Sequence, residues 1–245
     1  MSALSTRVIA VVPAYDEEGA IGAVVAGIRA LDDRFDVVVV DDASTDRTAG
    51  AAAAAGATVV RLPYNLGIGG AVQTGFRFAL EQGYEVAVRL DGDGQHDPAE
   101  LPKLLAPLEA GEADIVTGSR FTGGDNGYRP PLGRRIGIVF FARLVSLLTR
   151  QRVTDTTSGF QALNRRGIAL FAEDYPSDYP EVEATLLVLK HRLRLLEVPV
   201  RMREREHGTS SITLVRSVYY MLKVTLALFV AMFRRYTLPA EAAQQ

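Results

Sequence analysis

The amino-acid sequence predicts an α/β domain with a Rossmann-like, mostly parallel β-sheet covered by helices on both faces. Its 245 residues, 48% of them apolar, are enough to bury one sizeable core. Through the first half, short apolar runs alternate with segments of helical period. The runs are continuously apolar, which is typical of strands buried on both faces of a parallel sheet.

The strands expected in the first half are short runs of mainly β-branched residues. They are Val8–Val12, Val37–Val40, Thr58–Leu62, Val86–Leu90 and Ile115–Val116. The first run is too short for the core of a signal peptide, and no charged leader precedes it, so we expect a strand there.

Helix signals separate these strands. Apolar residues at helical spacing predict a helix from Ile21 to Leu31, and alanine content predicts another at Ala49–Ala55. A third candidate is Gly69–Gln82. The run Asp97-Pro98-Ala99-Glu100 combines an N-cap residue, a proline at the first helical position and a capping-box acid. A helix should begin there and end near Glu109.

The second half is less regular. We expect an apolar helix at Ile136–Leu148, a polar loop at Thr154–Gly159, a helix at Glu181–Arg192 and a strand at Leu195–Val200. A last, amphipathic helix should run from Ile212 to Arg235. The most plausible break precedes it, so we divide the chain into a domain of residues 1–211 and a C-terminal helix and tail of residues 212–245.

Charge is distributed unevenly along the chain. Residues 1–128 carry 19 Asp and Glu against 9 Lys and Arg, a balance of −10, whereas residues 129–245 carry 10 against 18, a balance of +8. The segment Arg129–Arg166 has eight arginines and one acid, Asp155. This asymmetry indicates an acidic metal or sugar site in one half and an anionic partner for the other, although a solvated basic face is the simpler alternative. The chain has no cysteine, which excludes disulfides and thiolate metal sites.

Unusual polar residues follow the expected strands where each strand ends. The segments are Pro13–Glu18, Asp41–Asp46, Asp91–Asp97 and Gly118–Arg120. Ligands of open parallel sheets bind beyond the carboxyl ends of the strands, so these segments should share one site.

The segment Asp91-Gly92-Asp93-Gly94-Gln95 is the strongest metal candidate. Two carboxylates two residues apart on a glycine-permitted turn can face one Mg²⁺ or Mn²⁺ ion, which could bridge the phosphates of a nucleotide. Gln95 could add a neutral oxygen. The alternative is a plain turn rich in Asp and Gly.

Two other strand ends could bind a nucleotide. Asp41 could accept hydrogen bonds from a ribose or base, while Asp42 or Ser44 could cap the next helix. Tyr15 could stack on a nucleobase, although the acids beside it could simply favour a helix N-terminus. Gly67 and Gly69 fail the dinucleotide fingerprint because Val72 stands at its third glycine, so we expect them to let the backbone approach a sugar nucleotide.

Together these segments resemble family 2 glycosyltransferases with the GT-A fold. The matching pieces are Val12–Glu18, Val40–Asp46, Asn65–Gly67, Asp91–His96 and Gly118–Arg120, in the order of the family. Asp155–Phe160 and His207–Ser211 are similar to the dolichyl-phosphate mannose synthase branch, which extends the resemblance to about residue 211. Two departures are Asp16, where many members have Asn, and the absence of the pair of C-terminal membrane spans found in many bacterial relatives.

The resemblance implies a role for particular residues. Those expected to hold the base, ribose and sugar phosphate are Pro13, Tyr15, Glu17, Asp41, Gly69, Asp91 and Gly92. Those expected to bind the metal are Asp91, Asp93 and Gln95. Those expected to meet the acceptor phosphate are Arg120, Arg134 and Ser210, and the catalytic set is then Asp91, Asp93, Arg120 and Arg134.

The expected reaction is inverting transfer of a hexose from a nucleotide sugar to a polyprenyl phosphate. A phosphate monoester needs no general base, because its second pKa is about 6 and it is already ionised at neutral pH. It needs arginines to bring it near the nucleotide diphosphate. The branch favours GDP-mannose as donor, with UDP-glucose or UDP-N-acetylglucosamine as alternatives.

Other functions remain as alternatives. A family 2 enzyme acting on a polysaccharide or soluble hydroxyl would need a catalytic acid, for which Asp155 and Glu183 are the candidates. A non-catalytic sugar-nucleotide-binding subunit is disfavoured by the intact pair of aspartates. A nucleotidyltransferase usually needs a Gly-rich basic loop after the first strand, and Pro13–Glu18 is not such a loop. Nucleic-acid binding is disfavoured because the basic half of the sequence predicts no basic sheet studded with aromatic side chains.

A lipid acceptor requires contact with a membrane surface. Ile212–Phe233 has 22 residues but contains Arg216 and Lys223, so it should lie in the interface rather than span the bilayer. Ile136–Leu148, with flanking arginines, could do the same. We expect a cytoplasmic protein, peripheral on the inner face of the plasma membrane. The alternative is that these helices pack on the sheet, in a homo-oligomer or against a membrane-protein partner.

Overall fold

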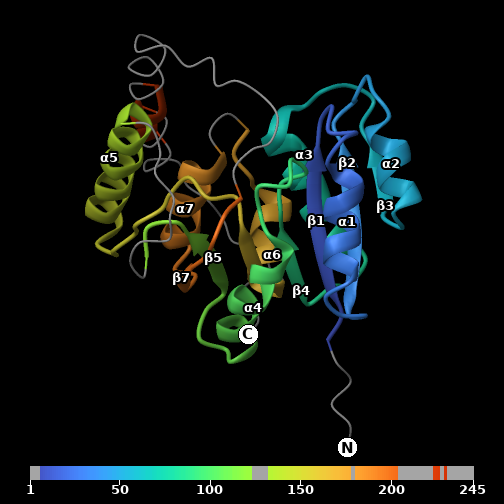
Figure 1. Cartoon of the computed structure of the whole chain (residues 1–245). Coiled ribbons are helices and arrows are strands. Elements are labelled where there is room, and N and C mark those ends of the chain that lie inside the picture. Colours follow the sequence, from blue (N-terminus) through green and yellow to red (C-terminus); the bar gives the residue numbers. More distant parts are fainter. Residues whose placement is uncertain (1–5, 123–131, 178–179, 204–222, 227–228, 231–245) are drawn as a thin grey trace, which may run out of the picture.

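The computed structural model describes residues 6–122, 132–177, 180–203, 223–226 and 229–230, except for the side chains of residues 132–134. Within these ranges the chain forms a central β-sheet with helices against both faces (Figure 1). The α/β fold class expected from the sequence is confirmed.

The sheet has seven strands in the order β3-β2-β1-β4-β6-β5-β7. They are β1 Val8–Ala14, β2 Phe35–Asp41, β3 Thr58–Arg61, β4 Val86–Arg89, β5 Ile115–Ser119, β6 Gln161–Asn164 and β7 Leu195–Pro199. β6 runs antiparallel to its neighbours β4 and β5, and every other pair is parallel. All six strands expected from the sequence are present, whereas β6 was not predicted.

The helices also follow the expectations in order. They are α1 Ile21–Arg29, α2 Thr48–Ala54, α3 Gly67–Glu81, η1 Pro98–Glu100, α4 Leu101–Glu109, α5 Leu132–Thr149, α6 Arg165–Glu173 and α7 Pro180–Lys190, where η1 is a 3-10 turn. α6 was not predicted. Asp97 caps η1 by accepting a hydrogen bond from Ala99 N at 3.1 Å. The carboxylate of Glu100, expected to complete a capping box, instead accepts from Arg201 N.

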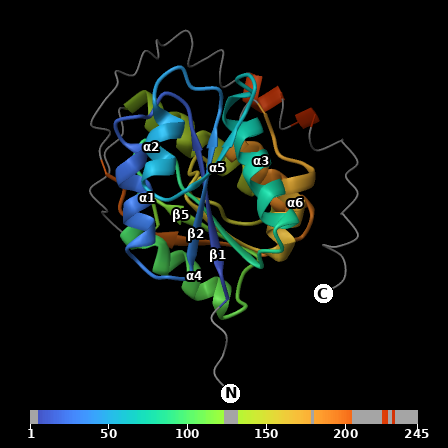
Figure 2. The same cartoon turned by 90° about the vertical axis from the view of Figure 1, so that its right-hand side faces the viewer.

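Alternate residues of β1 enter two separate cores. Val8, Ala10 and Val12 face the core under α1 and α4, whereas Ile9 and Val11 face the core under α3, α6 and α7. Figure 2 shows α1 and α4 on one side of the sheet and α3 and α6 on the other. This double covering explains why the strands are continuously apolar.

A third apolar cluster joins α5 to α7 and contains Val224. Residues 223–226 and 229–230 are helical, as the expected last helix requires, and the rest of Ile212–Arg235 lies outside the described residues. No helix in the described ranges is both long and apolar enough to cross a bilayer. The division of the chain at residue 211 stays a prediction.

The strand directions bring the functional loops to one edge of the sheet. β1, β2, β4 and β5 run in the same direction, so their carboxyl ends share the upper edge in Figure 1. Ala14 lies beside Asp41 in the ladder, and Val11 lies beside Arg89. The segments singled out in the sequence therefore gather at this edge.

Candidate active site

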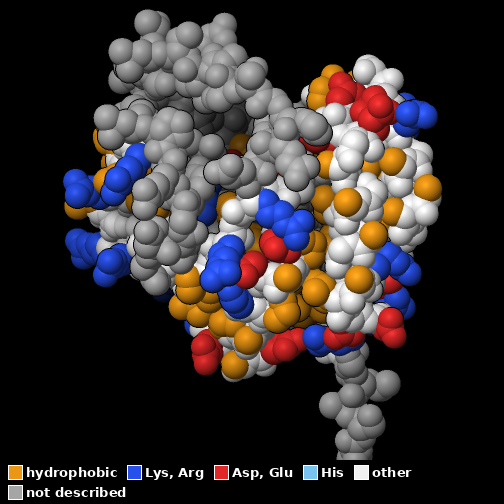
Figure 3. Space-filling view, viewed as in Figure 1, with side chains coloured by type: hydrophobic (Ala, Val, Ile, Leu, Met, Phe, Trp, Pro, Cys, Tyr) orange, Lys and Arg blue, Asp and Glu red, His pale blue; other side chains and the backbone are white. Residues whose placement is uncertain are grey.

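The loops that follow β1 and β2 are joined by hydrogen bonds in both directions. The N–H groups of Asp16, Glu17 and Glu18 donate to the side chains of Ser44, Thr48 and Asp46 at 3.0, 2.8 and 3.1 Å. In return, Thr45 N donates to Asp16 and Arg47 N donates to Glu18, at 2.8 and 3.0 Å. The two loops therefore form one unit, and Figure 3 shows acidic side chains gathered at this end of the molecule.

Two residues of this unit have left-handed backbone conformations, Asp16 with φ 52° and Ala43 with φ 60°. Such conformations are unfavourable for most residues but better tolerated by Asp and Asn. Asp16 thus combines a backbone role with the hydrogen bond to Thr45, and an asparagine oxygen could accept the same bond. The departure from the family at this position therefore preserves the geometry of the loop.

The residues predicted to hold a nucleotide lie around this unit. Pro13 is buried and its carbonyl accepts from Gly92 N at 3.3 Å, whereas the side chain of Tyr15 is exposed. Glu17 is half-buried. Asp41 is fully buried; its Oδ1 accepts from Ser44 N, and its Oδ2 has no hydrogen bond and lies 3.3 Å from Arg61 Nε. A buried oxygen without a hydrogen bond is costly, which fits a group that acquires a partner from a ligand.

Neither Asp42 nor Ser44 caps α2, contrary to one expectation. The N-cap position of α2 is Arg47, and Thr48 N donates to Asp46 Oδ1 at 2.9 Å. Asp42 Oδ1 instead accepts from Leu66 N at 2.7 Å, and Ser44 accepts from Asp16. The polar side chains after β2 therefore connect loops rather than cap the nearest helix.

Asp91, two residues after the end of β4, is held from several sides. Its N–H donates to His96 Nδ1 at 3.0 Å, and its Oδ1 accepts from Arg89 at 3.3 Å. The His96 ring stacks on Phe160 with centroids 4.9 Å apart. Burial opposes ionisation of Asp91, but the charge and hydrogen bond of Arg89 act against it, and its pKa lies below the ordinary value. Burial lowers the pKa of His96, and an Nδ1 that accepts a hydrogen bond likewise indicates a neutral ring.

Asp93 accepts two hydrogen bonds from Gln95, one from its backbone N at 3.0 Å and one from its side-chain nitrogen. In this arrangement Gln95 presents its amide nitrogen, rather than its oxygen, to Asp93. The described residues contain no group of three or more His, Cys, Asp or Glu arranged to hold a metal. Two carboxylates still fit Mg²⁺ or Mn²⁺, because Mg²⁺ in particular commonly takes one or two carboxylates and completes its shell with substrate phosphates and water.

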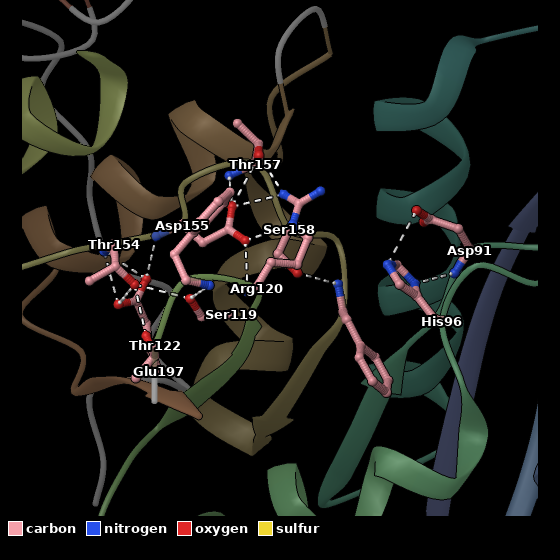
Figure 4. A network of polar contacts seen from close by, with 12 residues as sticks. Asp91, His96, Ser119, Arg120, Thr122, Thr154, Asp155, Thr157, Ser158 and Glu197 are labelled. Carbon is pink, nitrogen blue, oxygen red and sulfur yellow. Dashed lines mark hydrogen bonds and ion pairs between the residues drawn. The ribbon is translucent and has the colours of Figure 1, made fainter. Parts of the chain in front are cut away.

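Arg120 follows β5 and is buried against Asp155. Its Nε and one terminal nitrogen donate to the two carboxylate oxygens of Asp155, each at 2.8 Å (Figure 4). Burial opposes ionisation of Asp155, but Arg120 holds its pKa below the ordinary value. Such a forked pair is strongly oriented. A direct contact of Arg120 with an acceptor phosphate, as predicted, would have to form beside this pair or replace part of it.

Glu197 on β7 holds the loop that carries Asp155. Its carboxylate accepts from the N–H groups of Thr154 and Asp155 at 2.8 to 3.0 Å, and from the Thr154 hydroxyl at 2.8 Å. Figure 4 shows this network beside the end of β5.

Three other predicted site residues need comment. Arg134 lies in the first turn of α5 but its side chain is outside the described residues, as is Ser210. At Gly69, a Cβ atom would lie 2.2 Å from Pro176 O and 2.7 Å from Ser177 Cα. The backbone that approaches this glycine closely is therefore the protein's own, and its contact with a sugar nucleotide stays a prediction.

Sequence reasoning missed Arg89, Tyr175 and Glu197. Arg89 carried a signal, because a charged residue inside the apolar run Val86–Leu90 is unusual for a buried strand. Its partners could not have been read from the sequence, since Tyr175 and Glu181 are 86 and 92 residues away.

Comparison with known proteins gives concordant matches. The family model described as glycosyl transferase family 2 matches residues 9–170. An undecaprenyl-phosphate mannosyltransferase of Micrococcus luteus is 33% identical, covering 84% of this chain and 88% of that protein. A UDP-N-acetylglucosamine–dolichyl-phosphate N-acetylglucosaminyltransferase of Methanococcus voltae is 28% identical over 78% of this chain and 83% of that protein. The crystal structure of glucosyl-3-phosphoglycerate synthase from Mycobacterium tuberculosis with Mn²⁺ and UDP-glucose has a TM-score of 0.70 at 25% identity, covering 95% of this chain and 81% of that one.

Proposed function

The chain belongs to glycosyltransferase family 2 and has the GT-A fold. We propose that it is an inverting, metal-dependent hexosyltransferase, which moves a hexose from a nucleotide sugar onto a polyprenyl phosphate. The observation that carries the proposal is the shared edge of the sheet. The acidic turn Asp91–Asp93 follows β4, and Arg120, which is paired with Asp155, follows β5. Only β6 lies between β4 and β5 in the sheet. Donor and acceptor groups on one edge are what a direct transfer requires.

On the donor side, the joined loops after β1 and β2 would bind the base and ribose through Tyr15, Glu17 and Asp41. Asp91 and Asp93 would hold Mg²⁺ or Mn²⁺, which when bound stabilises the departing diphosphate. The two relatives use different sugars by name, one mannose and one N-acetylglucosamine. GDP-mannose is the favoured donor, followed by UDP-glucose and UDP-N-acetylglucosamine.

On the acceptor side, an ionised phosphate attacks the anomeric carbon directly and the configuration inverts. Arg134, at the start of α5, and Ser210 would orient that phosphate, with Arg120 beside them. This division explains why the basic half of the chain accompanies an acidic nucleotide half. No general base is needed, because the acceptor carries its charge before the reaction.

A lipid acceptor also requires a membrane surface, and α5 offers one. Ile136, Val139, Phe140 and Leu147 are exposed along one side of α5. Arg135 and Arg143 line the same groove as these residues. Figure 3 shows basic side chains gathered over α5 with apolar ones between them. Apolar residues flanked by arginines suit an anionic bilayer, so the protein would be peripheral on the cytoplasmic face.

Two measurements test the proposal. A thermal-shift panel of GDP-mannose, UDP-glucose and UDP-N-acetylglucosamine with Mn²⁺ should identify the donor, since a ligand of the native state raises its stability. Transfer from that donor should then occur to polyprenyl phosphate but not to the corresponding polyprenol. Equal transfer to the alcohol would favour the hydroxyl-acceptor alternative, and binding without any transfer would favour a non-catalytic subunit.

A further inference from the structure

Arg89 has no exposed surface although its guanidinium is charged. We propose that it is a positioning residue of the transfer reaction. It would fix the carboxylate of Asp91, on the donor side of the site, relative to Glu181 in the first turn of α7. The inference rests on the proposed function and adds a residue outside the segments that carry the family resemblance.

One guanidinium contacts three elements. One terminal nitrogen donates to Asp91 Oδ1 at 3.3 Å and to Glu181 Oε1 at 3.0 Å. The other donates to Tyr175 Oη at 2.6 Å. Arg89 therefore joins the acidic turn after β4 to the first turn of α7 and to the segment that follows α6.

The space around the guanidinium is closely fitted. A Cβ at position 159 would lie 2.8 and 2.9 Å from the guanidinium of Arg89 and 3.2 Å from Asp91 Oδ1, so Gly159 leaves the room that the arginine occupies. The Tyr175 ring packs on Phe171 and Phe76, with centroids 4.9 and 6.1 Å away. Arg89 and its partners thus have little freedom to move.

Stability alone is a weak reason for this arrangement. A buried ion pair often contributes no more than apolar residues of the same volume, and Arg89 Nε has no hydrogen-bond partner in the described structure. A guanidinium is not deprotonated in proteins, so the charge beside Asp91 is permanent. One terminal nitrogen of Arg89 donates to Oδ1 of Asp91, while Oδ2 lies 3.8 Å from His96 Nε2. The carboxylate that a metal or sugar would meet is therefore held in one orientation.

The test compares Arg89→Lys with Arg165→Lys. Lysine keeps the charge but lacks the planar fork, so it cannot hold two carboxylates and the tyrosine hydroxyl in one geometry. Arg165 lies next to Asn164, which pairs with Val86 at the opposite edge of the sheet, and it serves as the matched control. With the donor found by the panel, we expect Arg89→Lys to lower kcat by about 10- to 100-fold. The KM for polyprenyl phosphate should stay within about twofold, and Arg165→Lys should match the unmodified protein.

A second set of variants separates positioning from folding. Tyr175→Phe keeps the packed ring and all charges but removes one contact of Arg89. Its unfolding midpoint should fall because a buried N–H loses its partner, but kcat should be lowered even at temperatures where the variant is fully folded. The double variant Arg89→Met with Glu181→Gln keeps the charge balance of the pair. It should unfold at a temperature close to that of Glu181→Gln alone but turn over more slowly than that single variant.

Three results would overturn the inference: full kcat in Arg89→Lys, full kcat in Tyr175→Phe, or a double variant as active as Glu181→Gln alone. Each would mean that Arg89 only balances buried charge. Failure of the proposed function looks different, because the unmodified protein would then show no transfer. In that case, Mn²⁺-dependent stabilisation by UDP and GDP, compared in the same variants, still reports whether Arg89 positions Asp91.

Discussion

Asp16 is the residue at which this chain departs from many of its relatives, and the structure gives a physical reason why the change is tolerated. A left-handed conformation and an acceptor for Thr45 N are both required there, and aspartate and asparagine supply both. We predict that Asp16→Asn has an unfolding free energy close to that of the unmodified protein. Asp16→Ala should lose about 1–3 kcal/mol, from the left-handed backbone and the lost hydrogen bond. Urea unfolding of the two variants measures the difference, and equal stability would contradict this account.

Asp93 and Arg134 should fail in different ways if donor and acceptor sides are separate. Asp93→Ala should abolish turnover and remove Mn²⁺-dependent stabilisation by the nucleotide, since a metal carboxylate is lost. Arg134→Ala should raise the KM for polyprenyl phosphate by about 10- to 100-fold and leave nucleotide binding unchanged, as expected for loss of a phosphate contact. Steady-state kinetics with each substrate varied separates the two effects. The exposed Asp33, changed to Asn, serves as a control at the opposite end of the domain. Normal transfer by metal-free Asp93→Ala would refute the metal assignment.

Asp114, the residue before β5, fastens β6, α6 and the residue that precedes β7. Its buried carboxylate accepts from Asn164 Nδ2 at 2.9 Å and from Arg194 N at 2.8 Å, and pairs with Arg166 and Arg194. Burial opposes ionisation, but these partners hold the pKa below its ordinary value. A folded-state pKa below the unfolded one stabilises the fold above the unfolded pKa of about 4, and that contribution is lost as pH falls through the folded pKa.

We therefore predict that Asp114→Asn is less stable than the unmodified protein at pH 7 by about 1–3 kcal/mol, because charged hydrogen bonds are lost. The gap should begin to narrow once the pH falls below about 4, the unfolded pKa, and should close only as the pH passes through the lower pKa of the folded carboxyl. Urea unfolding at pH 7 and at a series of lower pH values down to the acid limit of folding tests both statements. A gap that stays constant over the whole series would show that the charge contributes little.

The helices and strands that carry strong local signals were predicted from the sequence, and those that depend on distant partners were not. β1, β2 and α1 are long, apolar and periodic, so their residues alone specify them. β6 has four residues and pairs with β4 and β5, more than 40 residues away, so its strand conformation comes from the sheet and not from its own sequence. The acidic turn was predicted because it follows a strand directly. Arg89 and Glu197 were missed because their partners meet only in the folded chain.

At the scale of the whole molecule, the sheet keeps the nucleotide half and the basic half on one continuous scaffold. β4 and β5 lie in the acidic half and β6 lies in the basic half, and β6 pairs with both of them through its backbone. α5 then packs with α7 through Phe141, Val145 and Leu186, which leaves its outer side exposed. α7 in turn carries Glu181, which pairs with Arg89 beside the acidic turn.

The exposed side of α5 makes the proposal of membrane contact testable on the intact chain. Ile136 and Leu147 are 55% and 76% exposed, far more than apolar residues that pack in a core. We predict that the protein co-sediments with vesicles containing anionic lipid. Changing both residues to Glu should weaken binding about tenfold or more, because two apolar side chains that would enter the bilayer are lost and two negative charges then face the anionic lipid. Higher salt should also weaken binding by screening the arginines. Leu31→Glu, at an exposed apolar position beside α1, is the matched control. Unchanged sedimentation of the double variant would mean that this side of α5 does not touch the bilayer.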